Sequence, residues 1–114
     1  MRKNSELTLR KQKDFNRVYK KGKSRGSRYI VLLYRSNNLG YTRTAFVSSK
    51  KVGNSVERNR SRRLMKESYY TVRDKIKKGY DIVFVARNSI NGKSLDDINR
   101  SLYGTLKACG LFVD

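Results

Sequence analysis

The sequence predicts an α+β fold in which helices pack against one sheet. Three stretches show apolar residues or faces at helical spacing, and runs rich in β-branched and aromatic residues lie between them. The resulting order is helix, three strands, helix, strand, helix. The chain of 114 residues contains no proline, no repeat and no low-complexity linker, so we expect residues 1–114 to form a single domain with a modest core.

The first helix is predicted over residues 11–21. Phe15, Val18 and Tyr19 follow the i, i+3, i+4 spacing that places side chains on one helical stripe. Gly22 comes directly after this stretch and is a typical stop signal.

Three apolar runs predict the sheet. Residues 29–34 are β-branched and aromatic, and their pattern leaves open whether they form one strand or two. Turn residues at 37–40 lead to a strand over 42–49, with Ala45 and Val47 on one face and Phe46 on the other. Residues 80–86 are apolar almost throughout, which is typical of a central strand.

The last helix is predicted to face the core. Ser94 and Asp97 have the spacing of a capping box at its start, and Gly110 is a stop signal at its end. The apolar residues step by 3, 4, 4 and 3 along one face: Leu95, Ile98, Leu102, Leu106 and Cys109.

An arginine-rich helix is predicted to begin after Asn54, with Glu57 three positions on completing a capping box. Successive residues of a helix are rotated by about 100°, which divides the side chains of this helix between two arcs of its surface. The narrow arc suited to burial holds Ser61, Leu64, Met65, Ser68 and Val72. The basic arc holds Arg58, Arg62, Lys66 and Arg73, with Asn59 and Arg63 beside it.

This basic helix is unfavourable in isolation. Arg58, Arg62 and Lys66 repel one another at i, i+4 spacing, each pair costing a few tenths of a kcal/mol. Arg58 and Arg60 also lie in the first turns, where the helix dipole favours anions. A phosphate backbone along the helix would reverse both penalties, and the planar guanidinium suits bidentate phosphate contacts.

The whole chain is strongly basic. It has 28 Lys and Arg against 9 Asp and Glu, a net charge of +19. Self-repulsion at this density opposes folding, so we expect a neutralising partner. Nucleic acid is favoured, because phosphate contacts release condensed counterions. A merely solvated basic surface needs far less charge.

The residues that could perform chemistry are few. The chain contains no histidine and a single cysteine, Cys109, which excludes Ser-His, Cys-His and zinc-finger arrangements. The carboxylates are scattered, and the pair Asp96 and Asp97 suits the first turn of a helix. Any reactive centre is therefore expected on a partner.

The composition also predicts a compartment. No stretch approaches the roughly 18 apolar residues that span a bilayer, and no apolar run follows the basic N-terminus. One cysteine rules out an internal disulfide and fits a reducing environment. We expect a cytoplasmic protein without membrane contact.

Three segments resemble the bacterial ribonuclease P protein family. The stretch from Lys50 to Lys66 contains Lys-Lys-x-Gly-Asn followed by Arg-Asn-Arg, which resembles the family's signature. The run that begins at Phe15 resembles its first helix and the following turn, and the strand before Arg87 resembles its last strand. Length, charge and element order agree as well, so the resemblance covers nearly the whole chain.

The resemblance implies a fold and an activity. The fold is αβββαβα with a left-handed β-α-β crossover, similar to domain 2 of ribosomal protein S5. The activity is that of an endoribonuclease subunit, in a ribonucleoprotein that removes the 5′ leader from precursor tRNA. A catalytic RNA performs the hydrolysis with Mg²⁺, which it binds mainly itself. The implied partners are this RNA, in a 1:1 complex, and precursor tRNA, but not DNA.

The resemblance also implies site residues. No catalytic residue is expected on this chain, and no direct metal ligand, although Asn59 is expected near a metal. A leader-binding cleft is expected to include Phe15, Tyr19, Tyr34 and Arg28, although the family's strand aromatic aligns with Leu33. The residues expected to contact the catalytic RNA are Lys50, Lys51, Asn54, Arg58, Asn59, Arg60, Arg62, Arg63 and Lys66.

Two alternatives remain open at this point. One is a structural RNA-binding protein of the ribosomal kind, without a role in processing. The other is a DNA-binding protein, against which there is no helix-turn-helix pair and no obvious dimer seam in the sequence. The aromatic residues do not decide between them, because Phe15, Tyr19, Tyr29 and Tyr34 could stack on unpaired bases or belong to the core.

Overall fold

The sheet has four strands in the order β1-β2-β4-β3. The computed structural model describes residues 7–113, and its strands are β1 Lys23–Gly26, β2 Ile30–Ser36, β3 Arg43–Val47 and β4 Tyr80–Ala86. β2 runs antiparallel to β1 and β4, whereas β3 and β4 are parallel neighbours. Parallel neighbours need a crossover connection, and α2, Ser55–Tyr70, provides it.

The register divides the sheet side chains between two faces. Ala45 pairs with Val83, and Val83 pairs with Leu33, so these three side chains point to one face. Phe46 pairs with Phe84 on the opposite face. Apolar residues therefore cover both faces of β4, as its unbroken apolar run predicts.

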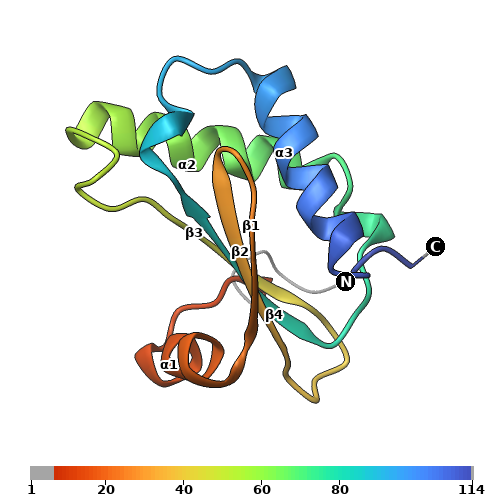
Figure 1. Ribbon diagram of the computed structural model, residues 1–114. Helices are drawn as coiled ribbons and strands as arrows, with labels where there is room; N and C mark the ends of the chain where they lie inside the picture. The colour runs from red at the N-terminus through yellow and green to blue at the C-terminus, as the bar shows by residue number, and fades with distance from the viewer. Residues whose placement is uncertain (1–6, 114) are drawn as a thin grey trace.

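Helices cover both faces of the sheet unequally (Figure 1). α1, Gln12–Lys21, packs on the face that carries Val83. α2 and α3, the latter spanning Leu95–Ala108, pack on the face that carries Phe84. The smaller core, under α1, is formed by Leu9, Val18, Ala45 and Val83, with Phe15, Leu33, Val47 and Val85 half-buried around it.

The larger core is centred on aromatic rings. The rings of Phe84 and Phe46 stack with centroids 5.3 Å apart, and Tyr69 of α2 packs at 5.4 Å from Phe84. Such pairs contribute about 0.5–1.5 kcal/mol beyond the burial of their area. This contact joins the arginine-rich helix rigidly to the centre of the sheet.

The observed elements agree with most of the sequence-based expectations. The N-caps Asn54 and Ser94 both form complete capping boxes. On α2, the expected buried arc is present from Ser61 to Ser68, but the helix ends at Tyr70. Placing Val72 and Arg73 on the helical arcs is therefore wrong.

Two further expectations need correction. Three strands were expected between the first two helices, and the one not located from the sequence is β1, in the polar segment Lys23–Gly26. Residues 29–34 do not break into two strands. A polar, glycine-containing edge strand gives no apolar signal, so its position follows from pairing with β2. Leu95 is 37% exposed and lies outside the core, at the first position of α3.

Candidate nucleic-acid interface

The start of α2 is a tightly hydrogen-bonded turn. The Asn54 side chain accepts a hydrogen bond from the Glu57 N–H at 2.9 Å, and the Glu57 carboxylate accepts one from the Asn54 N–H at 3.0 Å. Gly53 has φ +146°, and a Cβ there would lie 2.1 Å from Oε1 of Glu57. Glycine thus allows the carboxylate to fold back over the turn and fixes where the basic helix begins.

Three arginines of α2 are anchored by backbone oxygens. Arg58 donates to the carbonyl oxygen of Gly53 at 2.9 Å. Arg60 donates to the carbonyl oxygen of Lys93 at 2.8 Å, and Lys93 lies in the connection between β4 and α3. Arg62 donates to the carbonyl oxygen of Ser48 at 3.4 Å. Neutral carbonyls orient these guanidinium groups but leave their positive charge uncompensated.

No ion pair found among residues 7–113 involves a basic residue of α2. The ion pairs of this part of the chain belong to Arg17, Arg43 and Arg100. The Glu57 carboxylate is occupied by the capping box. The helix therefore presents several preoriented cations that form no ion pair within residues 7–113, which suits binding of a phosphate backbone.

The remaining predicted RNA contacts lie on the outside of this helix and the turn before it. Asn59 accepts a hydrogen bond from Arg62, and Lys66 lies 5.8 Å from the ring centroid of Tyr70. Asn54 is occupied as the N-cap, so its side chain shapes the turn. The exposed members of the predicted set are Lys50, Lys51, Asn54, Asn59, Arg63 and Lys66.

A second surface lies beside α1. The rings of Phe15 and Tyr19 stack with centroids 6.3 Å apart and an interplanar angle of 19°. Tyr19 is 46% exposed, and burial raises the pKa of its hydroxyl. Half-buried Leu33 and Val85 of the sheet pack against the same small core. The result is an apolar, aromatic surface that can stack with unpaired bases.

The structure separates Tyr34 and Arg28 from this surface, so a shared cleft with Phe15 and Tyr19 is wrong. Tyr34 packs on the α3 side of the sheet, 6.3 Å from the ring of Tyr80, whereas its neighbour Leu33 faces α1. Successive strand residues point to opposite faces, which is why an offset of one residue matters. Arg28 lies in the turn between β1 and β2, beside α3.

The fold also gathers basic residues that sequence analysis does not single out. Lys93 lies 5.6 Å from the ring centroid of Tyr29 and accepts the hydrogen bond from Arg60 through its carbonyl oxygen. Arg87 donates to the carbonyl oxygen of Ser27 at 2.7 Å. These contacts join segments far apart in the chain, and no sequence pattern predicts that these side chains lie together.

The donor set of the interface does not suit a metal ion held by this chain alone. Over residues 7–113, no group of three or more Cys, Asp or Glu is placed to hold a metal. Asn59, expected near a metal, already accepts a hydrogen bond from Arg62. Lysine and arginine side chains are cations and cannot act as Mg²⁺ ligands.

Among residues 7–113, no helix is long and apolar enough to cross a membrane.

The fold and the two surfaces define a small basic α+β protein with an exposed arginine-rich helix. The family model for Ribonuclease P matches residues 3–110, and the chain belongs to the bacterial ribonuclease P protein family. Its relatives named "Ribonuclease P protein component" include one from Clostridium botulinum (strain Loch Maree / Type A3), 47% identical over 108 residues, covering 94% of this chain and 97% of the relative. Another, from Clostridioides difficile (strain 630), is 45% identical over 100 residues, covering 87% and 88%.

Solved structures agree with this assignment. A mutant of the Staphylococcus aureus RNase P protein superposes with a TM-score of 0.89 at 31% identity, covering 96% of this chain and 92% of that one. The RNase P protein from Thermotoga maritima gives a TM-score of 0.80 at 30% identity, covering 89% and 96%. The expected fold class is confirmed. Family membership makes the chain a component of the ribonuclease P endoribonuclease, which processes the 5′ end of tRNA together with ribonuclease P RNA.

Proposed function

We propose that α2 and the turn before it bind the catalytic RNA of ribonuclease P, while the Phe15–Tyr19 surface binds the 5′ leader of precursor tRNA. The observation that carries the proposal is the anchoring of Arg58, Arg60 and Arg62 by neutral carbonyl oxygens. Their charge is held in position yet left available for phosphate. The protein would thereby promote endonucleolytic removal of the leader.

In this proposal the chemistry belongs to the RNA. Mg²⁺ bound mainly through the RNA would activate the attacking water and stabilise the charge that develops during cleavage. The chain's own residues bind and orient: α2 lowers the repulsion between phosphates, and the aromatic surface holds unpaired bases. A 1:1 complex with the catalytic RNA, located in the cytoplasm, remains the expected form.

A reconstitution assay tests the proposal. Precursor tRNA labelled at its 5′ end is incubated with a bacterial ribonuclease P RNA and a few millimolar Mg²⁺, with and without the protein. We expect the protein alone to be inert and the mixture to cleave at the mature 5′ end faster than RNA alone. Binding of the RNA without faster cleavage would favour the structural, ribosomal-type protein instead.

A charge-reversal variant tests whether α2 contacts the catalytic RNA. Arg62→Glu together with Arg63→Glu should abolish assembly with the catalytic RNA at low Mg²⁺, because both side chains would then repel phosphate. Lys75→Glu with Lys77→Glu is the matched control, since it reverses two exposed charges beyond the C-terminal end of α2, far along the chain from Arg62 and Arg63. Normal cleavage by the Arg62/Arg63 variant would contradict the proposed role of this face.

A further inference from the structure

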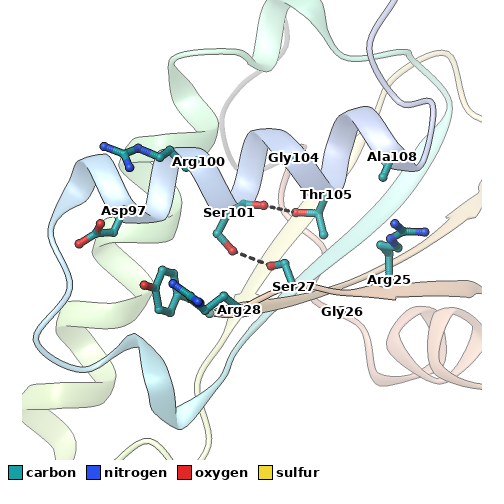
Figure 2. A pocket seen from close by; sticks show the side chains of 11 residues that line it. Arg25, Gly26, Ser27, Arg28, Asp97, Arg100, Ser101, Gly104, Thr105 and Ala108 are labelled. Carbon is teal, nitrogen blue, oxygen red and sulfur yellow. Dashed lines mark hydrogen bonds between the residues drawn. The ribbon is translucent and has the colours of Figure 1, made fainter.

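A cavity of about 390 Å³ lies between the β1–β2 turn and one face of α3 (Figure 2). At its floor, the hydroxyl oxygens of Ser27 in the turn and Ser101 in α3 are 2.5 Å apart. Thr105 donates to the carbonyl oxygen of Ser101 at 2.6 Å. The Ser27–Ser101 bond connects the turn to the helix, and the Thr105 bond lies within α3, so the space beside them is bounded by packed elements of the fold.

The sheet side of this cavity is basic. Arg25 and Arg28 line it, and both are exposed. Neither forms an ion pair within residues 7–113. Arg87 adds a third guanidinium at the same turn through its bond to the carbonyl oxygen of Ser27. On the helix side, the cavity is lined by the carboxylate of Asp97, which accepts hydrogen bonds from Ser94 in the capping box of α3. The turn thus gathers three arginines that form no ion pair within residues 7–113, facing the single lining carboxylate of Asp97.

The helix side of the cavity includes an unfilled position. Gly104 lies in the middle of α3, where glycine costs about 1 kcal/mol relative to alanine. A Cβ at this position would meet no atom within 4 Å, so no neighbouring element of the protein requires glycine there. The bare backbone leaves room for a ligand to approach the helix closely.

The cavity is continuous with the basic surface of α2. Tyr29 lines the cavity, and Lys93 lies over its ring at 5.6 Å. The carbonyl oxygen of the same lysine accepts the hydrogen bond from Arg60 of α2. A single RNA strand that lies along the start of α2 can therefore continue past Lys93 into the cavity without leaving the positively charged surface.

We propose that this cavity is a second RNA site, which takes one unpaired nucleotide with its phosphate on Arg25 and Arg28. The inference rests on the proposed function in that the partner is an RNA of the ribonuclease P complex. A volume of about 390 Å³ suits a nucleotide-sized ligand and excludes a duplex. The guanidinium forks suit phosphate, and the wall at Gly104 takes the ribose or base. The strand belongs to the catalytic RNA or to precursor tRNA, which share this chemistry.

Two variants test the site by different means. Arg25→Ala with Arg28→Ala removes charge, whereas Gly104→Leu fills the cavity and leaves the charge unchanged. Leucine is a good helix former, so the filled variant should fold at least as well as the wild type, which thermal unfolding checks. Lys75→Ala with Lys77→Ala is the matched control for the loss of two exposed positive charges.

The measurement is the salt dependence of RNA affinity in two arms: protein with catalytic RNA, and reconstituted holoenzyme with precursor tRNA. If two phosphate contacts with a single strand are lost, the slope of log affinity against log salt should become shallower by about 1.4 in one arm. The Gly104 variant should also bind more weakly in that arm, and the lysine control should match the wild type. The arm affected identifies which RNA enters the cavity.

The outcomes separate this inference from the proposed function. If the wild type accelerates cleavage while the arginine and Gly104 variants match it in both arms, the second site is refuted and the proposed function stands. If the arginine variant differs no more than the lysine control, the effect is general charge and the site is likewise refuted. If the wild-type protein fails to accelerate cleavage, the proposed function itself fails.

Discussion

Arg43 and Asp81 form a bidentate ion pair, in which Nε donates to Oδ1 at 2.9 Å and Nη2 donates to Oδ2 at 2.8 Å. Asp81 is 2% exposed, and its hydrogen bond raises the pKa of Arg43. The same guanidinium reaches Oδ2 of Asp14 in α1 at 3.3 Å. One side chain thus connects β3, β4 and α1, and thereby sets the position of the helix that carries Phe15 and Tyr19.

Breaking this pair should destabilise the fold. We expect Asp81→Asn to lower the free energy of unfolding by about 3 kcal/mol, because it leaves the largely buried Arg43 cation without its main counterion. Urea unfolding followed by circular dichroism measures this change. Asp96→Asn is the control: it removes the exposed pair with Arg100, which should contribute less than about 1 kcal/mol. Equal small losses for the two variants would contradict the role of the buried pair.

The two faces of the sheet should differ in leader recognition. Phe15→Ala and Tyr19→Ala should weaken binding of precursor tRNA to the holoenzyme while hardly changing binding of mature tRNA, because the stacked rings would contact the unpaired leader. Losing one stacked base contact corresponds to about 1–3 kcal/mol. Tyr34→Phe is the control, since Tyr34 packs on the α3 side of the sheet. Equal losses for precursor and mature tRNA would show that Phe15 and Tyr19 serve the core alone.

Gly53 should be required for the start of α2. A methyl group at this φ of +146° is strained and would clash with the Glu57 carboxylate, so Gly53→Ala should break the capping box. We expect a loss of about 1–2 kcal/mol in the free energy of unfolding, the typical cost of an N-cap. Gly40→Ala provides the comparison, because a Cβ there meets nothing within 4 Å. A Gly53 variant as stable as the Gly40 variant would disprove this requirement.

Tyr69 should make stability fall at alkaline pH. Burial raises its pKa above the ordinary value near 10, so the folded protein keeps a proton that the unfolded chain releases. Its contribution to stability is therefore complete below about pH 10 and is lost as the pH rises further. Relative to the Tyr69→Phe variant, the free energy of unfolding of the wild type should fall by up to about 1.4 kcal/mol per pH unit in this range.

Comparing the two proteins cancels the titration of the other tyrosines and of the lysines, which is common to both. The measurement is urea unfolding at several pH values from 9 upward. A difference between wild type and Tyr69→Phe that stays constant across this range would show that the Tyr69 hydroxyl ionises equally well in the folded protein.

Local patterns were sufficient for much of the fold and for one surface. The capping boxes at Asn54 and Ser94, the buried arc from Ser61 to Ser68 and the strand Tyr80–Ala86 follow from short-range spacing, because caps and periodicity depend on neighbouring residues. The family followed from the Arg-Asn-Arg segment, whose residues are adjacent in the chain.

Relationships between distant segments were decided by the tertiary structure. The polar edge strand β1 has no apolar pattern, and its place depends on pairing with β2. The face on which Tyr34 lies depends on strand register, which an offset of one residue reverses. The cavity between Arg25 and Gly104 exists because a turn and a helix about 80 residues apart in sequence pack together, and no spacing within either segment encodes that contact. Sequence alone determined the charge of this protein and its helical periodicities, whereas packing decided which charges stand together.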